Sequence, residues 1–236
     1  MKLSNVFWVF ILQVAVFCGG SLCKGHLTEG TVRIPKQLQC FAERYPEVET
    51  FVQNYPYEYN KCHYISLSVK QGEIPLFLQW DERWGYALYG DGWIGDSGCG
   101  PTALSMVVCG LTGTTNWNPK EVASFAMENG WYIDGVGTSW SLMTDGAEQL
   151  GVHGMNIEIT EDVILDQLTQ GHPCICSMRP GDFTKGGHFI VLTGIDENGR
   201  VIINDPNSPH NSEIHWDMDR ILPQIKQSWS FTHSDF

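Results

Sequence analysis

One cysteine of this sequence stands in a setting suited to nucleophilic chemistry. Cys99 is the third residue of SGCGPT, between two glycines and just ahead of a proline and an apolar run with helical spacing. The free amides and the dipole at the start of a helix favour negative charge, so they would stabilise a thiolate there. The two glycines would let a substrate backbone approach the sulfur and would permit backbone angles barred to other residues. A small buried cysteine in a glycine turn is the alternative interpretation.

A thiol nucleophile needs a general base, and one of the eight histidines is placed for that role. His188 follows two glycines and begins the stretch HFIVLTGI, which has the composition of a buried strand. The other histidines lie in polar segments or at the edges of elements. Because glycines leave space around an imidazole ring, we predict that His188 takes the proton of the nucleophile and later returns it.

An imidazole base also needs an acceptor that orients it, and two neighbouring residues compete for that role. Asn204 and Asp205 end the strand VIIND, which follows the strand of His188 after a tight turn. Alternation along a strand places their side chains on opposite faces, so only one of them can reach the ring. Asp205 is the predicted partner and Asn204 the rival. A turn residue before a proline, without a catalytic role, is the simpler interpretation of either.

A donor for a developing oxyanion would complete such a site. Gln79 is a polar residue in the otherwise apolar lead-in PLFLQW, and its amide could act together with the backbone amide of Cys99. The alternative is a polar residue at the edge of a strand. Two glycine-rich stretches, 135–140 and 179–187, are predicted to line the substrate groove.

The elements that must position these residues fall into two groups along the chain. Helical spacing, first-turn prolines and glycine stops predict helices over 36–44, 46–54, 101–109, 119–129, 139–150 and 161–170. The last third is rich in β-branched residues and predicts strands over 174–178, 188–195 and 200–205, with a hairpin turn at 196–199. Helices that precede an antiparallel sheet indicate an α+β fold.

The four candidate residues together carry a resemblance to a known family. The order Gln79, Cys99 in GCGPT, His188 in GGHFIVLTG and Asp205 in INDP resembles the papain-like cysteine peptidases, specifically family thirty-nine and its relatives, the bacteriocin-processing double-glycine leader peptidases. The segments QWDERWGY, GCGPT and GTSW resemble a stand-alone, exported bacterial branch, over about residues 74–229. The resemblance implies a papain-like fold, in which a helix-borne nucleophile docks against an antiparallel sheet that presents the base and its orienting acid.

Three segments are predicted from the composition. Residues 1–25 have a lysine at position 2, an apolar stretch at 6–17 and then small residues, which is typical of a secretory signal. The apolar stretch is short of the roughly 20 residues of a membrane span, so an uncleaved N-terminal anchor is the minor alternative. Residues 26–73 form a polar, tyrosine-rich extension with short helices, and 74–236 form the peptidase domain. We therefore expect a secreted or extracellular protein.

Cysteine usage, charge and motif content narrow the function further. In an exported chain, a disulfide between Cys40 and Cys62 would stabilise the extension by about 3 kcal/mol. No C-x-x-C pair occurs, and His210 and His215 are a weak ligand pair, so neither a metal nor another cofactor is expected. The chain has 14 Lys and Arg against 27 Asp and Glu, a net charge of −13, which argues against nucleic-acid partners. No G-x-x-x-x-G-K-[ST] pattern occurs, so we expect no transporter domain in this chain.

These observations predict an exported thiol hydrolase that cleaves peptide or amide bonds through an acyl-enzyme on Cys99, with His188 as the base. The expected substrate is a peptide or protein, with cell-wall peptides among the candidates. Two alternatives remain from the sequence. The same fold could transfer the acyl group to an amine, or it could serve as a non-catalytic binding module at the cell surface.

Overall fold

A six-stranded antiparallel sheet forms the framework of the fold in the computed structural model, which describes residues 32–233. In sheet order the strands are β5 (Val152–Asn156), β10 (Ile225–His233), β6 (Cys174–Met178), β7 (His188–Ile195), β8 (Val201–Asn204) and β9 (His215–Trp216). The predicted strands at 174–178, 188–195 and 200–205 are thus confirmed as β6, β7 and β8, and the α+β class is confirmed with them.

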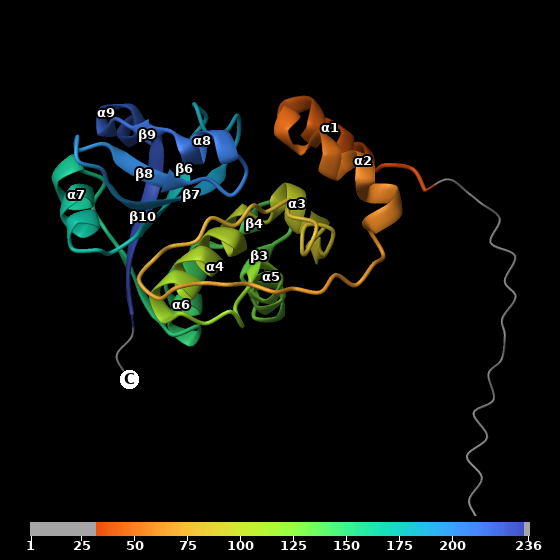
Figure 1. Ribbon diagram of the computed structural model, residues 1–236, viewed down its shortest axis with the longest axis horizontal. Helices are drawn as coiled ribbons and strands as arrows, with labels where there is room; N and C mark the ends of the chain where they lie inside the picture. The colour runs from red at the N-terminus through yellow and green to blue at the C-terminus, as the bar shows by residue number, and fades with distance from the viewer. Residues whose placement is uncertain (1–31, 234–236) are drawn as a thin grey trace, which may run out of the picture. The chain divides into compact units, whose positions relative to one another are not determined.

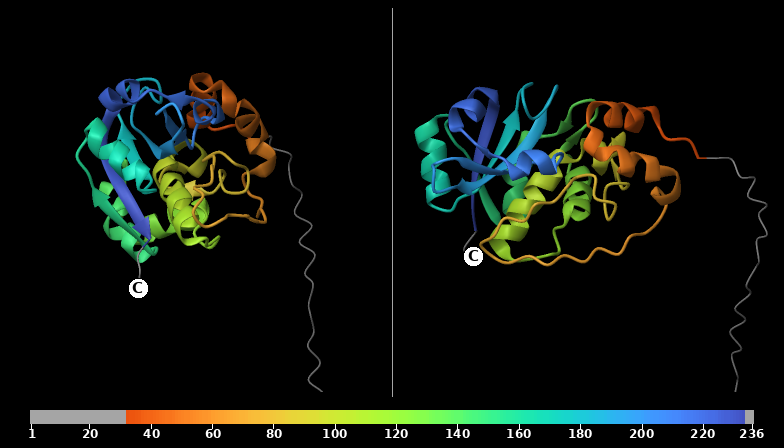
Figure 2. Two further views of the ribbon diagram at one scale, coloured as in Figure 1. Left: turned by 60° about the vertical axis from the view of Figure 1, so that its left-hand side comes forward. Right: turned by 45° about the horizontal axis from the view of Figure 1, so that its top comes forward.

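Helices cover both faces of this sheet (Figures 1 and 2). On one face, Ile175 and Val191 pack against α4 (Cys99–Thr112), which in turn packs against α5 (Pro119–Glu128). On the other face, Cys176 and Ile190 join a second cluster with α7 (Glu161–Thr169) and α9 (Met218–Ile221). Neighbouring residues of one strand therefore enter different clusters, as the alternation of side chains along a strand requires.

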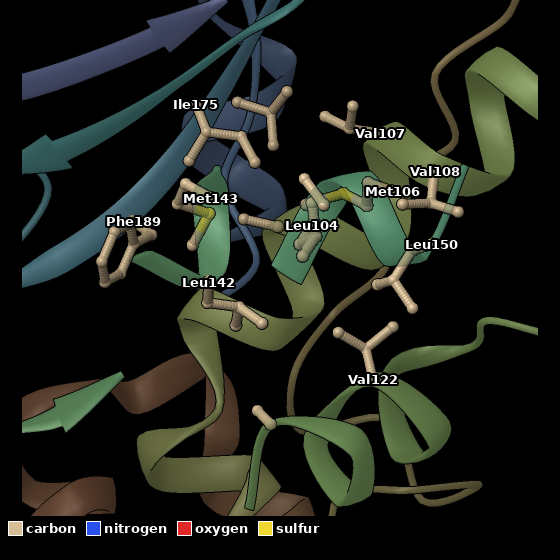
Figure 3. Packing of buried hydrophobic residues seen from close by; sticks show 14 of the residues in the cluster. Leu104, Met106, Val107, Val108, Val122, Leu142, Met143, Leu150, Ile175 and Phe189 are labelled. Carbon is tan, nitrogen blue, oxygen red and sulfur yellow. The ribbon is translucent and has the colours of Figure 1, made fainter. Parts of the chain in front are cut away.

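Helix α4 is the central helix of the larger cluster. Its residues from Gly100 to Gly110 are all buried, and Figure 3 shows Leu104 and Met106 between Ile175 of the sheet and Val122 of α5. The helix begins two residues before the predicted start and ends three residues after the predicted end. Its C-terminus is closed by Gly113, whose φ of 74° is the left-handed value that favours glycine at this position.

Other helices show where the sequence pattern was incomplete. The predicted helix at 139–150 is wrong as a single element, because Thr144 (φ −116°, ψ −81°) divides it into the short 3-10 helix η2 (Trp140–Met143) and α6 (Asp145–Gln149). The predicted helix at 46–54 continues to Glu58, as η1 (Pro46–Val48) followed by α2 (Glu49–Glu58). The remaining helices are α1 (Lys36–Arg44), α3 (Ile94–Ser97), α8 (Pro209–Glu213) and η3 (Leu222–Gln224).

Strands β5 and β10 were not predicted. Neither carries a continuous β-branched run, since their sequences are VHGMN and IKQSWSFTH. They become strands because β10 pairs with β6 on one side and with β5 on the other. Two small hairpins complete the sheet content, β1 (Leu88–Tyr89) with β2 (Gly92–Trp93), and β3 (Tyr132–Ile133) with β4 (Gly137–Thr138).

The segment before residue 74 makes defined contacts with the rest of the described chain. Phe51 of α2 stacks on Tyr86 with ring centroids 4.3 Å apart, and the Gln37 side chain donates to the Asp96 carboxylate. The disulfide considered between Cys40 and Cys62 is absent, because both are free thiols. Cys62 lines a pocket made by residues 59–63, 82–84, 86, 87 and 120, to which α1, the helix of Cys40, contributes no residue.

The predicted secretory signal falls within residues 1–31 and lies outside the described residues. Among the helices of residues 32–233, none is both long enough and apolar enough to cross a membrane.

Candidate active site

The sulfur of Cys99 lies at the N-terminus of a long buried helix, as predicted. Cys99 is the first residue of α4, so its backbone N–H belongs to the first turn and has no acceptor within the helix. Its side chain is half-buried and lines a cleft that also contains His188. The partial positive charge of the helix start therefore faces a thiol that is open to the cleft.

The predicted base and its orienting acid meet in the structure. His188 is the first residue of β7, and its Nε2 lies 2.7 Å from Oδ1 of Asp205, just after β8. His188 lines the same cleft as Cys99, and its interaction with Cys99 is among the causes that raise the pKa of the ring. Because the carboxylate of Asp205 occupies Nε2, Nδ1 is the ring nitrogen that is left for the sulfur. Cys99, His188 and Asp205 thus form one connected array.

The surroundings of His188 favour its protonated form. Burial of the ring lowers its pKa, but the charge of Asp205 and the hydrogen bond to it raise the pKa, and so do the hydrogen bond to Cys99 and the charge of a thiolate there. The opposing effects leave the pKa of His188 well above its usual value of 6.5. An imidazolium at neutral pH is the partner that a thiolate needs.

Asp205 is held by donors that sequence reasoning missed. The residue is fully buried, and its Oδ1 also accepts from the backbone N–H of Asn207 at 2.8 Å. Its Oδ2 accepts from the Asn211 side chain at 2.8 Å, so every oxygen of the carboxylate is occupied. Asn211 belongs to α8, whose N-cap is Ser208. The only signal in the sequence was the stretch SPHN, which has the form of a capped helix start.

Asn204, the rival for the orienting role, points elsewhere. Its side-chain nitrogen donates to the backbone carbonyls of Ile74 and Pro75, at 3.1 and 3.0 Å. It therefore ties β8 to the segment that leads to Gln79. The structure thus places Asp205, and not Asn204, against the His188 ring, and the two side chains face opposite ways, as expected for neighbouring residues of a strand. The orienting role of Asp205 stays a prediction.

Gln79 is not among the residues that line the cleft of Cys99, and its amide is partly used by the fold. The side chain is 3% exposed, and its Nε2 donates at 2.8 Å to the carbonyl of Gly95 in α3, the short helix directly before Cys99. Its Oε1 has no hydrogen-bond partner among the described residues. A carboxamide nitrogen has two N–H groups, so one donor remains beyond the bond to Gly95. The oxyanion role of Gln79 stays a prediction.

The glycines around Cys99 do not have the special backbone angles that were predicted for them. Gly98 has φ −88° and Gly100 lies within helical backbone, so neither needs an angle barred to other residues. A Cβ added to Gly98 would lie 2.7 Å from Ile94, and one added to Gly100 would lie 2.5 Å from Oγ1 of Thr138. The glycines therefore allow close packing within the protein, and their role in the approach of a substrate stays a prediction.

A cleft of about 640 Å³ surrounds the array, a size suited to a segment of a peptide. It is lined by Asp96, Ser97, Cys99, Ile133, Val136, Gly137, Thr138, Ser139, Trp140, Ser177, Gly187, His188, Phe189 and Lys226. The predicted stretch 135–140 contributes five of these residues. Of the stretch 179–187 only Gly187 does, because residues 181–185 line a separate pocket beside α8 and the N-terminal helices.

No group of three or more His, Cys, Asp or Glu side chains within the described residues is placed to hold a metal ion.

Comparison with known proteins identifies the family. The model of the Peptidase_C39 like family matches residues 71–234. Among solved structures, the peptidase domain of Streptococcus ComA, a bi-functional ABC transporter involved in a quorum sensing pathway, is similar to this chain at 19% identity and a TM-score of 0.46, over 58% of this chain and 93% of that domain. No curated protein matches the sequence. The family match covers most of the chain and includes every member of the array at Cys99, so this protein belongs to the Peptidase_C39-like family and has its papain-like fold.

Proposed function

We propose that this protein is a thiol hydrolase that cleaves a peptide or amide bond through an acyl-enzyme on Cys99. The observation that carries the proposal is the connected array of Cys99, His188 and Asp205, with the thiol and the ring lining an open cleft. A cysteine kept only for packing would not need a buried, carboxylate-paired histidine as its hydrogen-bond partner.

The reaction follows from the placement of the protons. The Cys99 thiolate attacks the carbonyl carbon, a C–S bond forms, and the carbonyl electrons move to the oxygen. The backbone amide of Cys99 and the free N–H of Gln79 are the proposed donors to that oxyanion. As the C–N bond breaks, His188 gives its Nδ1 proton to the leaving amine, and a thioester remains.

The second half-reaction regenerates the enzyme. His188 takes a proton from water, the resulting hydroxide attacks the thioester, and the C–S bond breaks to release the acid and the Cys99 thiolate. Asp205 remains ionised throughout and keeps Nε2 protonated. An amine in place of water would give acyl transfer with the same residues. We further propose export of the protein and a peptide or protein substrate, with cell-wall peptides among the candidates.

Thiol labelling tests the proposal without knowledge of the substrate. The background is the double variant Cys40→Ser and Cys62→Ser, because Cys62 is exposed and Cys40 is half-buried, whereas Cys109, Cys174 and Cys176 are buried. Alkylation of Cys99 by iodoacetamide, followed by peptide mapping, should be almost as fast at pH 6 as at pH 8. An ordinary thiol slows about a hundredfold over that range. Hydrolysis of a peptide library should be lost in Cys99→Ala.

A second variant tests the proposed oxyanion donor separately from the reactivity of the Cys99 thiol. Gln79→Ala should keep the rapid label, since the thiolate pair is intact, and should lose about 10²- to 10³-fold in hydrolysis. Labelling of Cys99 that appears only at alkaline pH, with no hydrolysis of any library peptide, would contradict the enzyme and favour a binding module.

A further inference from the structure

Strand β10 has a β-bulge beside the active-site cleft, and Lys226 is the extra residue of that bulge. Ile225 pairs with Met178, while Gln227 pairs with Ser177, the neighbour of Met178 on β6. An advance of two residues along β10 thus corresponds to an advance of one residue along β6, and Lys226 has no paired residue on β6. A β-bulge interrupts the regular alternation of side chains along a strand and so changes the direction in which a side chain points. Here the side chain of Lys226 lines the cleft.

The surroundings of Lys226 combine one cation with apolar surface. Its Nζ lies 5.2 Å from the ring centroid of Trp140, within the range of a cation–π contact. Trp140 is 42% exposed and lines the cleft, and its ring packs edge-on against Trp229 with the centroids 5.7 Å apart. Ser177 and Phe189, which pair across β6 and β7, line the same part of the site.

Lys226 has no ion-pair partner within residues 32–233, in contrast to several other cations of the chain. The cations that do have a carboxylate partner are Lys61, Lys70, Arg83, Arg200 and Arg220. The one acid that lines the cleft, Asp96, is used by the fold, because it accepts from the backbone N–H of Trp93 and from the side chain of Gln37. The cleft therefore offers one permanent positive charge that the described chain leaves unmatched.

We propose that Lys226 is a specificity-determining residue that binds a carboxylate of the substrate, while Trp140 and Phe189 contact the apolar part of the group that bears it. This inference rests on the proposed hydrolase function. The carboxylate could belong to an Asp or Glu side chain or to the C-terminus of the substrate peptide. Because the whole chain carries a net charge of −13, long-range attraction of an anion is not expected, and the selection must come from direct contact.

A library of matched peptides tests the inference. Each Glu-containing peptide has a Gln counterpart, and each peptide with a free C-terminus has an amidated counterpart. The wild-type protein should cleave the charged member of one of the two sets about tenfold faster in kcat/KM. The set that shows the preference identifies the source of the carboxylate. Raised ionic strength should reduce the preference, because the ammonium of Lys226 is exposed.

Variants of Lys226 test whether this residue causes the preference. In Lys226→Met the ratio of kcat/KM for the charged peptide to kcat/KM for its neutral counterpart should fall to about one. In Lys226→Glu, peptides with Lys in place of Glu should be preferred. Lys120→Met is the matched control, since it changes the net charge equally but lies in α5, away from the cleft. It should keep the wild-type ratio.

Two outcomes separate failure of this inference from failure of the hydrolase. Suppose that peptides are cleaved, but that the ratio of kcat/KM for charged to neutral peptides is one in wild type or is unchanged in Lys226→Met. The proposed role of Lys226 is then wrong, while the proposed hydrolase function is retained. If no peptide is cleaved and Cys99 lacks its rapid label, the hydrolase itself is wrong, and this inference falls with it. Rapid labelling of Cys99 in Lys226→Met shows that the variant has kept a folded site.

Discussion

At the scale of single residues, the site depends on a buried histidine whose two nitrogens have different partners. Asp205 holds Nε2 of His188, and the thiol of Cys99 is left with Nδ1. Full burial makes the carboxylate effective, because little water screens its charge. Asn207 and Asn211 occupy the remaining acceptor positions of Asp205, so its orientation toward the ring is fixed. The protonated ring is thus maintained by a chain of short polar contacts.

This arrangement predicts a pH profile for the reaction. The active form needs a protonated His188, so kcat/KM should fall as pH rises through the pKa of His188, which is raised well above 6.5. Asp205→Asn removes the charge that raises this pKa, so the alkaline limb should move to lower pH by about 1–3 units. The measurement is kcat/KM for a cleaved peptide as a function of pH.

The neighbouring asparagine provides the control. Asn204→Ala should leave the alkaline limb where it is in wild type, because Asn204 contacts backbone carbonyls and not the ring. It should instead lower the free energy of unfolding by about 1–3 kcal/mol, since two carbonyls lose their donor. A limb that moves equally in both variants would show that the His188–Asp205 contact does not set the pKa.

At the scale of elements, the cleft forms where α4 meets the β3–β4 hairpin. Gly100 of α4 packs closely against the side chain of Thr138 in β4, and the Thr138 hydroxyl is hydrogen-bonded to the Tyr89 hydroxyl at 2.7 Å. The hairpin and the η2 segment after it provide one wall, and the ends of β6, β7 and β10 provide the other. The short distance between helix and hairpin therefore fixes the width of the cleft above Cys99.

Gly100→Ala tests this contact. The added Cβ would come within 2.8 Å of three atoms of the Thr138 side chain, so the hairpin must shift away from α4. We expect a free energy of unfolding lower by about 1–3 kcal/mol and a peptide kcat/KM that falls more than the rate of Cys99 alkylation. Gly186→Ala is the matched control, because a Cβ there would meet nothing within 4 Å. Equal behaviour of the two variants would show that the contact does not shape the cleft.

At the scale of the whole molecule, the array of Cys99, His188 and Asp205 joins two parts of the described chain that pack through one core. Cys99 comes from α4 and His188 from β7, and residues of both elements belong to the larger hydrophobic cluster. Leu104 and Phe189 are members of that cluster (Figure 3), so the packing that stabilises the fold also fixes α4 relative to β7.

Leu104→Ala should therefore affect stability and catalysis together. Leu104 is fully buried, and its truncation leaves a cavity between α4 and the sheet, at a cost of about 2–5 kcal/mol in the free energy of unfolding. Val136→Ala, at a side chain 77% exposed, should cost less than about 0.5 kcal/mol. Denaturant unfolding measures both variants. A cost below about 1 kcal/mol for Leu104→Ala would show that this contact is not central to the core.

The sequence by itself determined the identity of the array and most of the elements that carry it. Cys99, His188 and Asp205 were identifiable because a helix start, a glycine-framed strand start and strand alternation are local properties of a few residues. The two-residue period of a strand showed that Asp205 and Asn204 could not both reach the ring, and the structure shows that Asp205 is the one that does.

Only the tertiary structure decided what depends on contacts between distant segments. Strands β5 and β10 form because of their partners, Asn211 orients Asp205 from a separate helix, and the glycines beside Cys99 accommodate Ile94 and Thr138. Lys226 enters the cleft because a register shift between two strands leaves it unpaired, and pairing register is set by the sheet as a whole. Local sequence patterns predict the candidate reacting groups, whereas the shape and charge of the cleft arise from packing between residues far apart in the chain.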